Sequence, residues 1–80
     1  MKPEPATQLG QNIADALAHF RLSLLALSDR SGVHVYSIVR IARGDYEPKL
    51  ATVCALAAGL NCETWELLKP GHFANRRIAA

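Results

Sequence analysis

Three basic side chains near the middle of the chain are the first candidates for binding chemistry. Arg40, Arg43 and Lys49 fall within ten positions, whereas the acidic residues are scattered. Guanidinium and ammonium groups gathered in this way attract an anionic partner. The alternative is that they belong to an ordinary solvated surface. The formal net charge of +2 does not decide between the two, because dedicated nucleic-acid binders carry a larger basic excess.

The histidines and cysteines do not form a catalytic or metal-binding pattern. His19, His34 and His72 have no Ser, Cys or carboxylate at a spacing that suggests a shared site. Cys54 and Cys62 stand eight positions apart, without a CxxC pair, so their spacing indicates neither a zinc site nor a disulfide framework. We therefore predict that the protein is not an enzyme, has no cofactor or metal, and keeps two buried thiols in a reducing cytoplasm.

Length and composition favour one small all-α domain. The 80 residues are 50% hydrophobic but only 6% aromatic, and Ala and Leu dominate, which favours helices over sheet. A core of this size only just offsets the entropy of ordering the chain, so association with a second copy would add to the stability of the fold. The first residues lack the apolar segment of a signal peptide, and the longest uncharged run, from Leu50 to Cys62, is too short to cross a bilayer.

Apolar residues that recur every three or four positions predict five helices. Residues 1–6 are expected to be a flexible lead, residues 7–68 the folded domain, and residues 69–80 a tail. For that tail, disorder is favoured over a dimer arm or a phosphate contact. The expected helices run from about Gln8 to Arg21, Leu24 to Arg30, Val35 to Arg43, Leu50 to Leu60 and Glu63 to Leu68.

Capping residues mark where these helices begin and end. Thr7, Ser23 and His34 can each accept a hydrogen bond from a backbone N–H in the first turn of a helix. Gly32 can adopt the positive φ that ends the second helix, and Asn61 can do the same after the fourth. The segment 23–44 is therefore predicted to be a helix-turn-helix.

The same periodicity predicts which side chains point inward. Ser28 and Ser31 are small, and we expect them to let the third helix approach the second closely. The residues expected to pack in the core are Leu9, Ile13, Leu17, Phe20, Leu27, Val33, Ile38, Ile41, Leu50, Val53, Cys54, Leu56, Ala57 and Leu60.

From about Leu9 to Leu68 the chain resembles the Cro/CI-type helix-turn-helix family, also called the XRE family. The shared elements appear in order. LGQNI opens the first helix, LS introduces the second, and RSGV forms the turn. RIARG closes the third helix, an EP loop leads to the apolar fourth helix, and WELL follows. The resemblance implies a compact five-helix bundle of the lambda-repressor-like DNA-binding type.

The resemblance also implies which side chains contact DNA when the third helix enters the major groove. Arg40 is the strongest candidate for base readout, because its guanidinium can donate two parallel hydrogen bonds to O6 and N7 of guanine. Tyr36 and Val35 can reach a base edge or a thymine methyl group, although both could instead be packing residues. The implied base contacts are Val35, Tyr36, Val39 and Arg40, and the implied phosphate contacts are Ser23, His34, Arg43 and Lys49.

Some positions depart from the family pattern and reduce the expected number of phosphate contacts. Leu24 stands where the family often has Gln, and Ala42 stands where it often has Glu. In the first helix, Ala14, Asp15 and Leu17 replace a commonly basic strip. Each lost phosphate contact lowers the slope of log K against log salt by about 0.9. DNA binding is then expected to be weaker, more dependent on dimerisation, or lost.

Two functions from different classes follow. The resemblance implies a sequence-specific transcriptional regulator, a repressor that binds a pseudo-palindromic operator in double-stranded DNA as a homodimer. The alternative is a protein–protein interaction module, such as an antitoxin or adaptor, that keeps the fold and uses an apolar face. That face comprises Leu24, Leu25, Val35 and Val39.

The dimer is inferred from the specificity that an operator requires, because one domain that reads four or five base pairs cannot single out an operator. The expected dimer interface comprises Trp65, Leu68 and Phe73, although Trp65 could equally cover the core.

Overall fold

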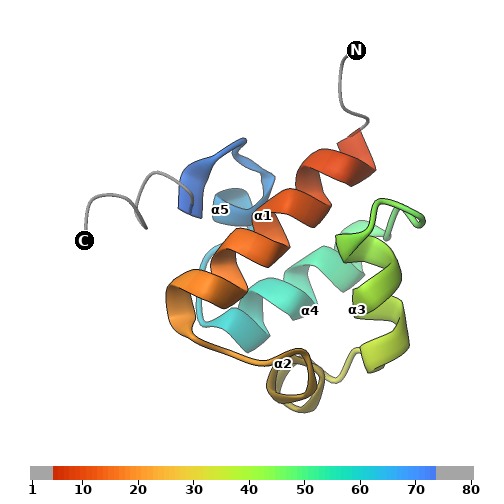
Figure 1. Cartoon of the computed structure of the whole chain (residues 1–80), viewed down its shortest axis with the longest axis vertical. Coiled ribbons are helices and arrows are strands. Elements are labelled where there is room, and N and C mark those ends of the chain that lie inside the picture. The colour runs from red at the N-terminus through yellow and green to blue at the C-terminus, as the bar shows by residue number, and fades with distance from the viewer. Residues whose placement is uncertain (1–4, 74–80) are drawn as a thin grey trace.

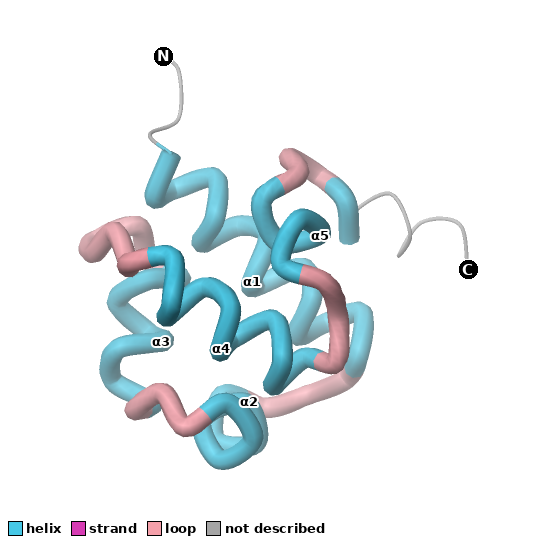
Figure 2. Tube along the Cα trace, turned by 180° about the vertical axis from the view of Figure 1, so that it is seen from behind, coloured by secondary structure: helices cyan, strands magenta, loops and turns pink. Residues whose placement is uncertain are grey.

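The computed structural model describes residues 5–73, which form a bundle of α-helices without any β-strand. The all-α prediction is confirmed. Helix α5 lies on the side of the bundle opposite to α2 and α3, as both views show (Figures 1 and 2). The helices are α1 (Pro5–Phe20), α2 (Leu24–Ser31), α3 (Val35–Ala42), α4 (Leu50–Leu60) and α5 (Thr64–Leu68).

The core lies where all of these helices meet. Helix α2 packs against α4 and α3, while α1 packs against α3 and α5. Most of the buried side chains are aliphatic, as expected for a chain with few aromatic residues. The buried core comprises Leu9, Ile13, Ala16, Leu27, Ile38, Ile41, Val53, Leu56, Ala57, Leu60, Leu67 and Phe73.

Helix α1 begins and ends one to three residues before the predicted positions. It starts at Pro5, so Thr7 lies inside the helix and is not its cap. Proline suits a first helical position, because its fixed φ is already helical and its missing N–H would have had no partner there. The helix stops at Phe20, because Arg21 adopts a positive φ of 55° and Leu22 N–H donates back to Leu17 O at 2.9 Å.

The other predicted caps are confirmed. The Oγ of Ser23 accepts from the N–H of Ala26, and the Nδ1 of His34 accepts from the N–H of Tyr36. Gly32 has a φ of 77° and Asn61 a φ of 60°, and both close their helices in the left-handed conformation. Local signals in the sequence therefore define the start and end of α2 and the start of α3.

Helix α4 has an outward face that the sequence pattern assigned to the core. Leu50 is 66% exposed and Cys54 is exposed, and their four-residue spacing puts them on one side of the helix. The prediction that both thiols are buried is wrong for Cys54, while Cys62 is half-buried. In α1, Phe20 is 37% exposed, because the helix ends there at the rim of the bundle. Helix α4 is apolar on several faces, so periodicity alone does not select the buried one.

Phe73 is not available to a partner chain, contrary to its assignment to the dimer interface. Its side chain is 1% exposed and contacts the rings of His19 and Phe20, with ring centroids 5.7 Å and 5.5 Å away. The start of the predicted tail is therefore part of the core. The burial of an aromatic ring explains why the chain after α5 turns back onto α1. Residues 74–80 of the predicted tail and residues 1–4 of the lead lie outside the described residues.

A buried amide on α1 holds this returning segment in place. The Nδ2 of Asn12 donates to the carbonyl oxygens of Leu67 and Lys69, at 2.6 Å and 3.1 Å, and its Oδ1 accepts from Gly71 N–H at 3.3 Å. The Asn12 side chain is 0% exposed; its bond to Leu67 is buried, and its bonds to Lys69 and Gly71 are partly buried. The carbonyls at the end of α5 thus find partners on α1.

Two glycines allow helices to cross in backbone contact. A Cβ at Gly10 would lie 2.6 Å from the carbonyl oxygens of both Ile41 and Ala42, and a Cβ at Gly59 would lie 2.8 Å from Ser31 Cβ. The small side chain of Ser31 therefore allows α4 to pack closely against α2, whereas the sequence prediction was that it allows α3 to do so. Helix α1 touches the end of α3 in the same manner. These crossings fix the positions of α2 and α3 on the rest of the bundle.

We expect the Gly10→Ala substitution to destabilise the protein by about 1–3 kcal/mol, because the added methyl group overlaps backbone carbonyls that cannot rotate away. The better helix propensity of alanine, worth about 1 kcal/mol, opposes this loss without cancelling it. Urea denaturation measures the difference. Ala14→Gln, at an exposed position of the same helix, is the control and should change stability by about 0.5 kcal/mol or less. If the Gly10→Ala protein is as stable as the original chain, this would contradict the close crossing of α1 and α3.

The two cysteines should differ in reactivity. Burial, followed by the charges of Glu66 and Glu63, raises the pKa of the Cys62 thiol from 9.0 to about 11. Iodoacetamide at pH 8 should therefore label Cys54 first, since the thiolate is the reactive form. Mass spectrometry of the Cys54→Ser and Cys62→Ser proteins assigns the two rates, and equal rates would contradict this difference.

The same pKa shift predicts a loss of stability at alkaline pH. The folded thiol of Cys62 keeps its proton up to about pH 11, whereas the unfolded thiol releases it near pH 9.0. The stabilising contribution is complete below pH 9.0 and is lost as the pH rises through the folded value. The Cys62→Ser protein should lack this component in denaturation curves recorded between pH 8 and 11.

Candidate nucleic-acid interface

Helix α3 has a buried face and an exposed face with different chemistry. Ile38 and Ile41 are 0% exposed and point into the core. Tyr36, Arg40 and Arg43 follow one another at intervals of four and three residues, so they form a single outward stripe. Tyr36 is 65% exposed, and both arginines are exposed. The helix therefore offers an aromatic hydroxyl and two guanidinium groups to a partner.

The turn before α3 is held by two serines of α2. Ser28 Oγ donates to Val33 O at 2.7 Å, and Ser31 Oγ accepts from Val33 N–H at 3.1 Å. Both polar groups of the Val33 backbone are thereby satisfied while its side chain packs against the core. These bonds fix the angle between α2 and α3. The serines thus define the turn, in addition to the packing role that their size suggested.

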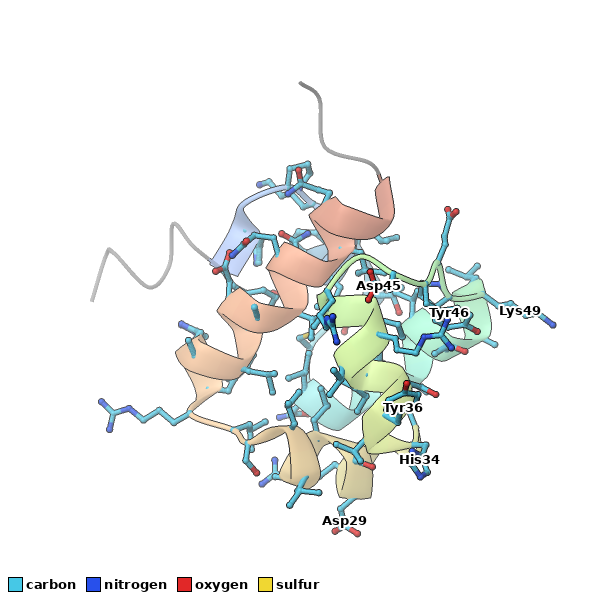
Figure 3. All side chains as sticks on the ribbon, turned by 45° about the vertical axis from the view of Figure 1, so that its right-hand side comes forward. Asp29, His34, Tyr36, Asp45, Tyr46 and Lys49 are labelled. Carbon is cyan, nitrogen blue, oxygen red and sulfur yellow. The ribbon has the colours of Figure 1, made fainter. Side chains whose placement is uncertain are left out.

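Ser23 and His34, two of the predicted phosphate contacts, both act as helix caps. The Oγ of Ser23 accepts from Ala26 N–H at 3.0 Å, which leaves its O–H free to donate to an anion. The Nδ1 of His34 accepts from Tyr36 N–H at 3.1 Å, so Nε2 carries the ring proton. Figure 3 shows His34 and Tyr36 projecting from the first turn of α3. Each residue can cap its helix and donate to a phosphate at the same time.

The other two predicted phosphate contacts differ in their surroundings. Arg43 pairs with Asp45 through an Nε–Oδ2 distance of 3.5 Å, with side chains 71% and 53% exposed. An ion pair this exposed is worth about 0–1 kcal/mol, so it does not prevent the guanidinium from moving to another anion. Lys49 precedes α4 and extends into solvent on the side of the molecule that carries Tyr36 (Figure 3). Arg43 is thus the last residue of the outward stripe of α3, and Lys49 lies outside that stripe on the same side of the molecule.

Tyr46 is a residue of this surface that the sequence did not single out. The Cζ of Arg40 lies 5.5 Å from the centroid of the Tyr46 ring, within the range of a cation–π contact. The ring is brought there by the end of α3, where Gly44 N–H donates to Ile41 O at 3.0 Å and Asp45 N–H to Arg40 O at 2.9 Å. This Schellman motif reverses the chain. A glycine directly after a helix was the available signal.

The apolar residues near this surface are less exposed than the interaction-module hypothesis assumed. Leu24 is half-buried and packs against the core, and Val35 and Val39 are half-buried. Leu25 is 71% exposed and is the large aliphatic side chain of this group that faces solvent. The apolar face predicted from the sequence is therefore reduced mainly to one leucine.

Acidic residues lie among the basic ones. Asp29 is exposed in α2, and Asp45 and Glu47 are exposed in the loop after α3. Figure 3 places Asp29 below His34 and Asp45 beside the end of α3. Opposite charges at this spacing keep the local potential low. The surface is suited to directed contacts by individual side chains more than to long-range attraction of an anion.

The remaining predicted interface residues lie elsewhere, on α5. Trp65 is 56% exposed and Leu68 is 52% exposed, so Trp65 does not cover the core. The Trp65 ring meets the ring of His72 edge-on at 5.2 Å. A pocket of about 220 Å³ next to Leu68 is lined by Gln8, Leu9, Leu67 and Leu68. The structure thus separates the stripe of α3 from the apolar surface of α5.

Within residues 5–73, no group of three or more His, Cys, Asp or Glu is arranged to hold a metal ion. None of the helices in this part of the chain combines the length and apolar character that crossing a membrane requires. The chain matches no protein-family model, no curated protein and no solved structure.

Proposed function

We propose that the protein is a lambda-repressor-like helix-turn-helix regulator of the Cro/CI type that binds double-stranded DNA through α3. The observation that carries this proposal is the outward stripe of Tyr36, Arg40 and Arg43 on a helix whose other face is locked into the core. A rigid helix with exposed donors along one side can enter a major groove and contact base edges. Binding as a repressor would occlude the polymerase.

Each side chain of the surface has a specific role in this proposal. Arg40 donates two hydrogen bonds to O6 and N7 of a guanine. Tyr36 donates its hydroxyl to a base edge or phosphate, and Val35 and Val39 meet thymine methyl groups with the parts of their side chains that stay exposed. Ser23, His34, Arg43 and Lys49 contact phosphates and set the position of α3.

The low local charge has a consequence for affinity. Asp29, Asp45 and Glu47 repel phosphates near the same surface, so one copy of the domain gains little from counterion release. Two copies on a pseudo-palindromic site add their contacts and their selectivity. We therefore propose a homodimer, with Trp65 and Leu68 of α5 at its interface.

A protein-interaction module is the second candidate, because Leu25 and Tyr36 are exposed at the front of the helix-turn-helix. The half-burial of Leu24, Val35 and Val39 weakens this candidate, since a contact surface needs a contiguous apolar patch. The exposed hydrogen-bond donors of Tyr36, Arg40 and Arg43 on α3 favour DNA over a protein as the partner.

We expect the protein to bind duplexes selected from a random DNA pool, with affinity that falls as salt rises. Fluorescence anisotropy at 50 and 200 mM salt measures this. Arg40→Ala should lower affinity for the selected site by about 1–3 kcal/mol and relax the preference at one base pair. Lys69→Ala removes a positive charge next to α5 and is the matched control, with little expected effect. Absence of binding at 50 mM salt would leave the interaction module as the function.

We expect Leu68→Glu to dissociate the proposed homodimer, because it places a charge in an apolar contact. Sedimentation velocity at micromolar protein concentration should show a dimer for the original chain and a monomer for the variant. Leu25→Glu, at a leucine on the opposite side of the bundle that is more exposed than Leu68, is the control and should stay dimeric. A monomeric original chain, even with DNA bound, would exclude the paired operator.

A further inference from the structure

The contact between Arg40 and Tyr46 joins the outward stripe of α3 to the loop that follows it. Arg40 is exposed and Tyr46 is 39% exposed, so the pair lies at the surface that would face a partner. The guanidinium carbon is 5.5 Å from the ring centroid. Exposed arginine side chains otherwise sample many rotamers, and ordering one on binding costs conformational entropy. A ring contact in the free protein reduces that cost.

Neighbouring carboxylates do not draw the Arg40 guanidinium away from the Tyr46 ring. Asp45, the acidic residue next to Tyr46, pairs with Arg43 at 3.5 Å. Among the described residues, no carboxylate forms an ion pair with Arg40. A carboxylate would occupy the N–H donors of the guanidinium, whereas attraction to the ring does not consume them. Arg40 is thereby restrained while its donors stay available for a base.

The backbone fixes Tyr46 beside Arg40 through the end of α3. The N–H of Asp45 donates to the carbonyl of Arg40 itself, at 2.9 Å, so the residue before Tyr46 is tied to the residue that Tyr46 contacts. Gly44, with a φ of 79°, makes this reversal possible. The position of the Tyr46 ring is therefore set by hydrogen bonds at the end of α3, and not by the conformation of an unrestrained loop.

We propose that Tyr46 is a positioning residue that sets the guanine preference of Arg40, an inference that rests on the proposed DNA-binding function. Its ring holds the guanidinium in the orientation that meets the O6 and N7 edge of guanine. Tyr46 acts through Arg40 and does not itself read a base. The partner of this site is a duplex with a guanine at the position that Arg40 contacts.

The test compares Tyr46→Phe with Tyr46→Leu on the selected DNA site and on the same site with that guanine replaced by adenine. Tyr46→Leu should lower the guanine-over-adenine preference by about 2- to 5-fold, as expected for an exposed cation–π contact, while Tyr46→Phe should retain it. In the Arg40→Ala background, Tyr46→Leu should have no further effect on this preference. A persistent effect there, or loss of preference in Tyr46→Phe, would overturn the inference.

A DNA-free measurement separates this inference from the proposed function. In the NMR spectrum of the free protein, the Arg40 Hδ resonances should be shifted by the Tyr46 ring current, and Tyr46→Leu should remove that shift. A missing shift in a protein that binds DNA overturns the role of Tyr46 alone. If the ring-current shift is present but the protein binds no DNA at 50 mM salt, the proposed function is overturned. The proposed guanine preference is then overturned as well.

Discussion

The backbone contact between α1 and α3 is the constraint on which the rest of the structure depends. Gly10 has no side chain, so α1 comes close enough for a Cβ at that position to overlap the carbonyls of Ile41 and Ala42. At this distance Ile38 and Ile41 are completely buried, and α3 can neither roll nor tilt without losing core packing. The matching contact of Gly59 with Ser31 holds α2 against α4.

Fixed helices also determine where the connecting segments go. The end of α3 reverses the chain and brings Tyr46 back to Arg40, and the end of α5 is held by Asn12 so that Phe73 reaches the core. In both places, hydrogen bonds that satisfy helix-terminal carbonyls also place an aromatic ring. One ring completes the surface of α3, and the other completes the packing against α1.

The sequence predicted most of the fold and part of the candidate site. Ser23, Gly32 and His34 are local signals, and their caps were predictable because each depends on one or two neighbouring residues. The exposure of Cys54 was not predictable, since several faces of α4 are apolar and only the neighbouring helices select the one that is buried. Tyr46 was missed for a related reason, because its contact with Arg40 requires the chain to turn back.

The sequence by itself determined that the chain is helical, where α2 begins and ends, where α3 begins, and that Ile38 and Ile41 face inward. These features depend on spacing and on hydrogen bonds within a few residues. Only the tertiary structure decided that Gly10 and Gly59 are crossing points, that Asn12 joins α1 to α5, and that Phe73 belongs to the core. Those outcomes depend on contacts between residues far apart in the chain, for which local patterns carry no signal.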